Sequence, residues 1–125
     1  MTREERKTLL IDLCMRLPYH PKIKIYNDSW EGCQKGEFDS NLYFHHAEAF
    51  LCDRIEILPY LRPMSSMTDE EKLDYIALGD IKRYTNPQYA YLISEQLDYL
   101  NAHHFDYRGL IPMGLALESK EEMYN

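Results

Sequence analysis

The sequence predicts an α+β fold in which a small antiparallel sheet of three or four strands packs with about three helices. Three observations support this prediction. Apolar residues recur at helical spacing over residues 1–17, an alternation of isoleucine and lysine follows them, and a second helix start comes after a proline-bracketed extended segment. The connections between the expected strands are too short for parallel crossovers, which favours an antiparallel sheet. A length of 125 residues is typical of one domain, so we expect residues 1–125 to form a single domain.

The first helix is expected to begin after Thr2, which suits an N-cap, with Glu4 and Glu5 in the first turn. Pro18 ends it. Its apolar face comprises Leu9, Leu10, Leu13, Cys14 and Leu17.

Three strands are expected after this helix. The alternation over His20–Tyr26 predicts the first strand, and Asn27–Ser29 is turn material. Trp30–Phe38 is expected to contain a short second strand. A turn at Asp39–Asn41 then leads into a third strand over Leu42–His46, where side chains again alternate.

The middle of the chain combines two helix signals with an extended segment. The spacing of Asp53 and Glu56 resembles a cap, so Arg54–Leu58 is interpreted as one helical turn stopped by Pro59. Prolines at both ends keep Pro59–Pro63 extended.

A second helix is predicted over Asp69–Leu78. Thr68 and Glu71 have the spacing of a capping box, in which each side chain satisfies one backbone N–H of the other residue. Gly79 is placed to cap its C-terminus.

A third helix is predicted to begin with Asn86 as its cap and Pro87 at its first position, and to end near His103. Its expected buried face comprises Tyr89, Leu92, Ile93, Leu97 and Leu100. Asp106–Gly109 is expected to form a turn, and the apolar segment Leu110–Leu117 a strand or a short helix. Residues 118–125 are expected to fray.

Net charge bears on the class of partner. The formal net charge is −7, which argues against general binding to nucleic acid or to an anionic membrane. Residues 1–24 carry six basic and three acidic residues, a balance of +3, so the rest of the chain carries −10. We expect the basic segment to pack beside the acidic body; the alternative is a nucleic-acid-binding patch. The residues of that patch would be Arg3, Arg6, Lys7, Lys22 and Lys24.

Three cysteines, with no Cys-x-x-Cys pair, are typical of free thiols in a reducing compartment. No window reaches the ~18 apolar residues of a membrane span. We therefore expect a cytoplasmic protein without a cofactor. A zinc site would draw on Cys33, His45, His46 and Cys52. We expect no metal, because the two histidines would face opposite sides of the predicted strand.

The densest polar cluster lies at the end of the third predicted helix. In an enzyme, His103 or His104 would serve as a general base, with Asp106 to orient it and Arg108 to bind an anionic substrate. The structural interpretation is favoured, because adjacent histidines point in different directions and the acidic and basic residues can close a turn. We therefore expect no catalytic site, and keep these four residues as weak catalytic candidates.

Eleven tyrosines are the most unusual feature of the composition. Tyrosine combines a large contact area with a polar tip, and interfaces favour it. Tyr84, Tyr91, Tyr99 and Tyr107 are therefore the candidate binding residues. Two alternatives stay open: these tyrosines form an interface, or they cover the boundary of a small core. The same holds for Met64 and Met67.

Three blocks of the sequence resemble a known family. They are Asp12–Tyr19 (DLCMRLPY), Ile57–Thr68 (ILPYLRPMSSMT) and Asn101–Ile111 (NAHHFDYRGLI), about a quarter of the chain. These blocks resemble an uncharacterised family of small proteins encoded by gut anaerobes of the Bacteroides type and by their phages and integrated elements. The resemblance implies a mobile-element protein and carries over no catalytic residue.

Taken together, these features favour a small cytoplasmic, phage-borne protein-interaction module with an acidic, tyrosine-rich surface. A nucleic-acid mimic is a special case of this hypothesis. An enzyme using the cluster at residues 103–108 and a nucleic-acid-binding module using the basic segment are the alternatives. A homodimer is a further alternative, because an open sheet leaves edges to be covered and a dimer is the commonest way to cover them.

Overall fold

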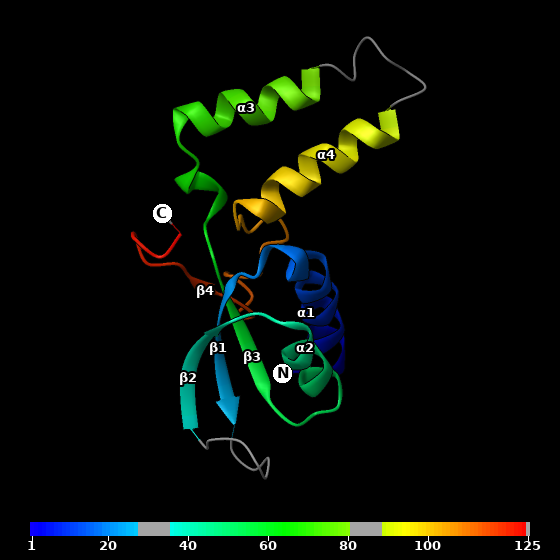
Figure 1. The fold of residues 1–125 in the computed structure, drawn as a ribbon, viewed down its shortest axis with the longest axis vertical. Coiled ribbons are helices and arrows are strands. Elements are labelled where there is room, and N and C mark those ends of the chain that lie inside the picture. Colours follow the sequence, from blue (N-terminus) through cyan, green and yellow to red (C-terminus); the bar gives the residue numbers. More distant parts are fainter. Residues whose placement is uncertain (28–35, 81–88, 125) are drawn as a thin grey trace.

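The structure is a computed structural model, which describes residues 1–27, 36–80 and 89–124, with side chains at 79–80 and 89–93 excepted. The predicted α+β class is confirmed: the described residues form four α-helices and a four-stranded, mostly antiparallel sheet (Figure 1). No helix among these residues is long and apolar enough to cross a membrane.

The sheet has the strand order β2-β1-β3-β4. Its central strands are β1 (Lys22–Asn27) and β3 (Glu56–Leu61), which pair antiparallel with Ile25 opposite Ile57. β2 (Gly36–Asn41) pairs antiparallel with β1, and the two-residue β4 (Leu117–Glu118) pairs parallel with β3.

Two helices pack beside the sheet. The first, α1 (Arg3–Arg16), begins with the reciprocal Thr2–Glu5 capping box and passes into a 3-10 turn at Leu17–Tyr19. The second is α2 (Phe44–Leu51). Together with the sheet they enclose the main apolar core, which consists of Leu9, Leu13, Ile23, Ile25, Leu42, Ala49, Phe50, Ile55, Ile57, Leu61, Leu110, Leu115 and Ala116.

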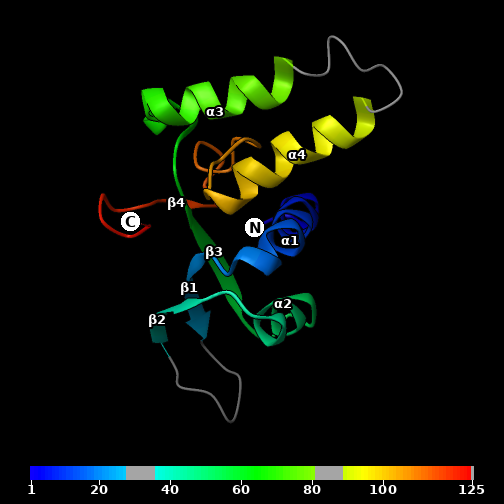
Figure 2. The same cartoon turned by 45° about the horizontal axis from the view of Figure 1, so that its top comes forward.

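The other two helices form a hairpin beyond the end of the sheet. α3 (Asp69–Asp80) follows β3 through a 3-10 turn at Met64–Ser66, and α4 (Tyr89–Ala102) lies beside α3 (Figures 1 and 2). A second, smaller core joins this hairpin to the body. It consists of Met67, Leu100 and Phe105, with Tyr75, Tyr99 and Tyr107 packed against it.

Two predicted elements are wrong. The segment Leu42–His46 is not a strand, because α2 begins at Phe44 and the backbone N–H of Tyr43 donates to Nδ1 of His46 at 3.0 Å, which closes the helix start. The helical turn predicted at Arg54–Leu58 does not form: Glu56–Leu58 belong to β3, where they pair with β1, and Arg54 and Ile55 precede that strand.

Smaller boundaries also differ from expectation. The turn predicted at Asp39–Asn41 lies within β2, and Gly79 lies inside α3 rather than at its cap. The predicted cap at Asn86 and Pro87 and most of the predicted strand Trp30–Phe38 lie outside the described residues.

The C-terminal segment is docked, so the expectation that it frays is wrong for residues 118–124. The backbone N–H of Ser119 donates to the carbonyl of Leu61 at 2.8 Å, and the hydroxyl of Tyr124 bonds to the backbone of β1 and β3. The preceding apolar segment, predicted as a strand or short helix, consists of turns up to β4.

Candidate functional site

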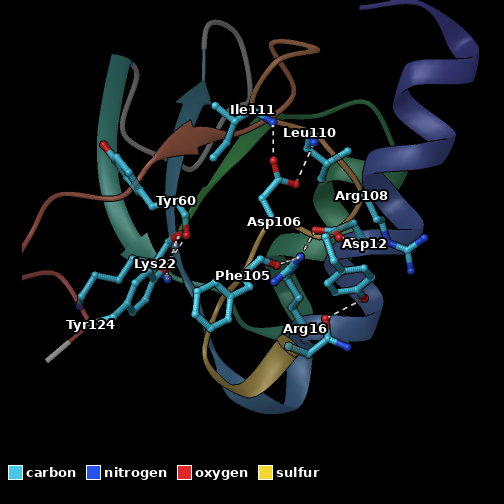
Figure 3. Close-up of polar contacts among 12 residues, drawn as sticks. Asp12, Arg16, Lys22, Tyr60, Phe105, Asp106, Arg108, Leu110, Ile111 and Tyr124 are labelled. Atoms are coloured by element: carbon cyan, nitrogen blue, oxygen red, sulfur yellow. Dashed lines mark hydrogen bonds and ion pairs between the residues drawn. The ribbon is translucent and has the colours of Figure 1, made fainter. Parts of the chain in front are cut away.

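The four weak catalytic candidates do not converge. The carboxylate of Asp106 accepts hydrogen bonds from the backbone N–H groups of Leu110 and Ile111 at 2.8 and 2.9 Å (Figure 3). Arg108 donates from Nε to Asp12 of α1 at 3.1 Å. No hydrogen bond or ion pair between described residues joins two of the four candidates. Asp106 and Arg108 hold the backbone after α4 in place.

A buried ion pair anchors this region to α1. Asp12 and Arg16, one helical turn apart, are both 0 % exposed, and Nε of Arg16 lies 2.7 Å from Oδ2 of Asp12. A second guanidinium nitrogen of Arg16 donates to the carbonyl of Phe105 at 2.7 Å (Figure 3). The pair therefore links α1 to the turn after α4.

His104 lies next to this network. Its backbone has a φ of 63°, its ring stacks on Tyr124 at 3.9 Å, and its Nδ1 is buried without a hydrogen-bond partner. Burial and, after it, the positive charge of Arg16 lower the pKa of His104 to about 4. At neutral pH the ring is therefore neutral and serves as a packing surface for the C-terminal segment.

Tyr124 fastens that segment to the sheet. Its hydroxyl accepts from the backbone N–H of Lys22 at 2.7 Å and donates to the carbonyl of Tyr60 at 2.6 Å (Figure 3). Burial raises the pKa of Tyr124 to about 12, so the hydroxyl keeps its proton. One side chain thus joins the end of the chain to two neighbouring strands.

His103 points to the other side, toward the start of α3. There the carboxylate of Glu71 pairs with both terminal nitrogens of Arg62 and accepts from the backbone N–H of Thr68, which confirms the predicted capping box. Nδ1 of His103 lies 3.6 Å from Glu71. Hydrogen bonds from Arg62, ahead of the one from Thr68, hold the pKa of Glu71 at about 2.

A pocket of about 740 Å³ opens beside these residues, between the start of α3 and the C-terminal segment. Two of its polar groups are already bonded: the ionised carboxylate of Glu71 accepts from Arg62 and Thr68, and the hydroxyl of Ser66 donates to the carbonyl of Pro63 at 2.6 Å. This arrangement stabilises the start of α3, and it brings no nucleophile into contact with His103.

Among the described zinc candidates, the rings of His45 and His46 lie close together, with centroids 4.0 Å apart, but no third ligand joins them. Cys33 lies outside the described residues, and Cys52 is an exposed free thiol. His45 and His46 lie on α2, so the argument from opposite faces of a strand does not apply. Burial lowers the pKa of His46 to about 4. Within the described ranges, no three metal-ligating side chains come together.

The candidate tyrosines that the structure describes are engaged internally. The hydroxyl of Tyr107 donates to Asn101 at 2.9 Å, and the guanidinium of Arg16 lies over its ring. Tyr99 is half-buried, and its ring lies 4.2 Å from that of His103. The side chains of Tyr84 and Tyr91 lie outside the described part. Of the two methionines, Met67 is buried and Met64 is exposed.

Several basic side chains of the N-terminal segment are also engaged in contacts within the molecule. Arg6 pairs with Asp53 and Glu56, and its guanidinium stacks over Phe50. Lys24 lies 4.0 Å from Glu37 across the β1–β2 pair. Arg3 and Lys7, by contrast, form no ion pair with a described residue, and they lie on one side of α1 at i, i+4 spacing.

The exposed side of α3 is a candidate binding surface that the sequence analysis missed. Leu73 is 69 % exposed and Ile76 is 52 % exposed, although both belong to a regular helix, and Ala77 between their turns is exposed as well. Tyr75, on the opposite side, packs against Tyr99 of α4. The spacing i, i+3, i+4 of these three apolar residues was readable from the sequence, but it indicated a buried face.

Exposed carboxylates surround this apolar stripe: Asp69, Glu70 and Asp74. We define the α3 face as the three apolar residues, Leu73, Ile76 and Ala77, together with these three acidic ones. An amphipathic helix that docks into a groove presents apolar anchors at this same spacing.

No family model, curated protein or solved structure matches the chain.

Proposed function

We propose that the chain is a small protein-interaction module and that the α3 face is its binding surface. The observation that supports the proposal is the exposure of Leu73 and Ile76 on a helix whose other side is packed. Exposed apolar side chains that gather on one element mark interaction sites more often than isolated ones do.

The chemistry of the α3 face favours a protein groove over other partners. The three carboxylates of this face flank apolar side chains, and Lys72 adds a positive charge beside them, whereas a nucleic-acid mimic needs long rows of negative charge. The partner is therefore expected to offer an apolar groove with basic residues at its rim.

The alternative functions have less support. Three of the five residues in the proposed nucleic-acid patch, Arg6, Lys22 and Lys24, already bond to neighbouring side chains. The catalytic candidates contact separate parts of the molecule: His103 lies beside Glu71 of α3, His104 stacks on Tyr124, Asp106 bonds to the backbone that follows it, and Arg108 bonds to Asp12 of α1. Among the described residues, the four catalytic candidates are therefore not directed toward one ligand.

The proposal is tested by capturing partners from host lysate, with and without nuclease, using tagged wild-type protein and the variant L73D. Met113, which is 49 % exposed and lies away from α3, supplies the matched control M113D. We expect a discrete, nuclease-resistant protein whose recovery falls at least tenfold in L73D, as for loss of a central anchor, and is unchanged in M113D. Recovery of the same partner in equal amounts with all three proteins would refute the α3 face as the binding surface.

A further inference from the structure

A groove that suits the α3 face exists on the chain itself. It has a volume of about 900 Å³ and lies between α1 and α2. Its lining residues are Arg3, Glu4, Arg6, Lys7, Leu10, Phe50, Leu51 and Asp53. We call this surface the α1–α2 groove.

The groove has an apolar part and a basic part. Leu10, which is half-buried, and Leu51, which is 64 % exposed at the end of α2, form its apolar side, whereas Phe50 is 1 % exposed and lies under the guanidinium of Arg6. Arg6 is neutralised by Asp53, which leaves Arg3 and Lys7 as cations without an ion pair among the described residues, beside one exposed carboxylate, Glu4.

The α3 face carries the opposite charge. Asp69, Glu70 and Asp74 surround Leu73 and Ile76, with Lys72 as the one described cation on that stretch of helix. The apolar anchors thus match the apolar side of the groove. Glu70 and Asp74 match Arg3 and Lys7, which form no ion pair with a described residue, whereas Asp69 lies 4.0 Å from Lys72 of its own helix. Complementary charge of this kind sets the register of an interface and steers association.

The two surfaces cannot meet within one molecule. In both views α3 lies at one end of the molecule, and α2 lies toward the other end, beyond α1 (Figures 1 and 2). Contact between them requires a second copy.

We propose that the chain self-associates head to tail, with the α3 face of one copy in the α1–α2 groove of the next. This inference rests on the proposed function and names the partner of the same surface. Because the two surfaces differ, the contact is heterologous: each added copy leaves one free α3 face and one free groove, so the assembly grows into a chain or closes into a ring.

The test compares the molar mass of wild-type protein with that of two variants by sedimentation velocity over a range of protein concentrations. L73D removes the anchor on α3, and L51D places a charge in the groove. Both side chains are mostly exposed, so both variants keep the fold, which circular dichroism verifies. We expect the mass of the wild type to rise with concentration and each variant alone to stay at the monomer mass of 15.0 kDa.

Mixing the two variants gives the decisive result. L73D retains an intact groove and L51D retains an intact α3 face, so an equimolar mixture can form one contact and no more. We expect a species of twice the monomer mass, with M113D behaving as the wild type. A mixture that stays monomeric, or a wild type that is monomeric at every concentration, would overturn the proposal.

Two further results separate this inference from the proposed function. The first result comes from exchanging charges: we expect K7E and D74K each to weaken association and the double variant K7E/D74K to restore it. Restoration would place Lys7 opposite Asp74, and no restoration would contradict that pairing. Capture of a different protein through Leu73 by a wild type that stays monomeric would overturn the head-to-tail contact and leave the proposed function intact. If L73D changed neither the capture of a partner nor the molar mass of the assembly, both the proposed function and the head-to-tail contact would be refuted.

Discussion

Two features in different regions of the molecule contrast: a buried ion pair in the body and an exposed apolar stripe on one helix of the hairpin, although the body also exposes apolar side chains such as Phe44 and Leu51. In the body, formed by the sheet with α1 and α2, the ion pair of Asp12 and Arg16 is fully buried and bonded to the turn after α4. In the helical hairpin, Leu73 and Ile76 of α3 are exposed although they are apolar. Burying charge costs free energy unless it is paired, and exposing apolar surface also costs free energy. The charged cluster therefore has a structural explanation, whereas the exposed apolar residues have none in the fold, which is why we propose that they bind a partner.

The largest effect is expected when the buried ion pair of the body is broken. The variant D12A leaves Arg16 charged, fully buried and without its carboxylate, so we expect the free energy of unfolding to fall by about 3–5 kcal/mol. Urea denaturation followed by circular dichroism measures it. The matched control is D53A, which removes the 78 % exposed partner of Arg6 and is expected to cost about 0–1 kcal/mol. Equal losses of unfolding free energy in D12A and D53A would mean that burial does not strengthen the contribution of the Asp12–Arg16 pair to stability.

A smaller effect is expected at the C-terminal segment. The variant Y124F keeps the ring stacked on His104 but removes the hydroxyl from the backbone groups of Lys22 and Tyr60. Leaving those groups without a partner is expected to cost about 1–3 kcal/mol and to make the C-terminus easier for carboxypeptidase to digest. Y43F, at an exposed tyrosine, is expected to stay within about 0.5 kcal/mol of the wild type. Unchanged digestion of Y124F would show that the tyrosine does not hold the segment.

The sequence predicts elements well where a local signal is complete. The capping boxes at Thr2–Glu5 and Thr68–Glu71 both form, and the alternation around Ile25 becomes β1. The prediction from sequence fails at α2. A helix start made by a backbone N–H and the ring of His46 has no common sequence signature, and the alternation there favours a strand.

The contacts that give the candidate residues a structural role are long-range in the sequence. Arg108 bonds to Asp12 and Tyr124 bonds to Lys22, pairs about a hundred positions apart that local patterns cannot foresee. The exposure of Leu73 and Ile76 could not be predicted from the sequence for a related reason. An apolar stripe on a helix predicts burial, and the sequence does not say which of two helical sides packs against α4.

The pH dependence of stability tests the charged cluster of the body more finely. The pKa of His104 is about 4 in the folded protein, below its ordinary value of 6.5, so the unfolded state binds more protons between these values. The contribution of His104 is therefore complete above about pH 6.5 and is lost as the pH falls toward 4.

We expect H104N, which tolerates the positive φ, to flatten the plot of unfolding free energy against pH in this window. His46, with a folded pKa of about 4 as well, leaves a residual slope that the double variant H46N/H104N removes. A slope unchanged by H104N would mean that His104 titrates alike in both states.

The smallest effect on stability is expected at the α3 face, where the hairpin differs most from the body. Since Leu73 is mostly exposed, L73D is expected to change the free energy of unfolding by no more than about 0.5 kcal/mol. Leu100, on α4 in the same hairpin, is 4 % exposed, and L100A is expected to cost about 2–5 kcal/mol. Urea denaturation of both variants makes the comparison. If L73D instead cost as much as L100A, the residue would belong to the hairpin's own packing, and the reason for assigning the α3 face to binding would be gone. A variant that keeps its stability while losing association separates the two roles, because an apolar side chain that contributes nothing to folding is free to contribute to an interface.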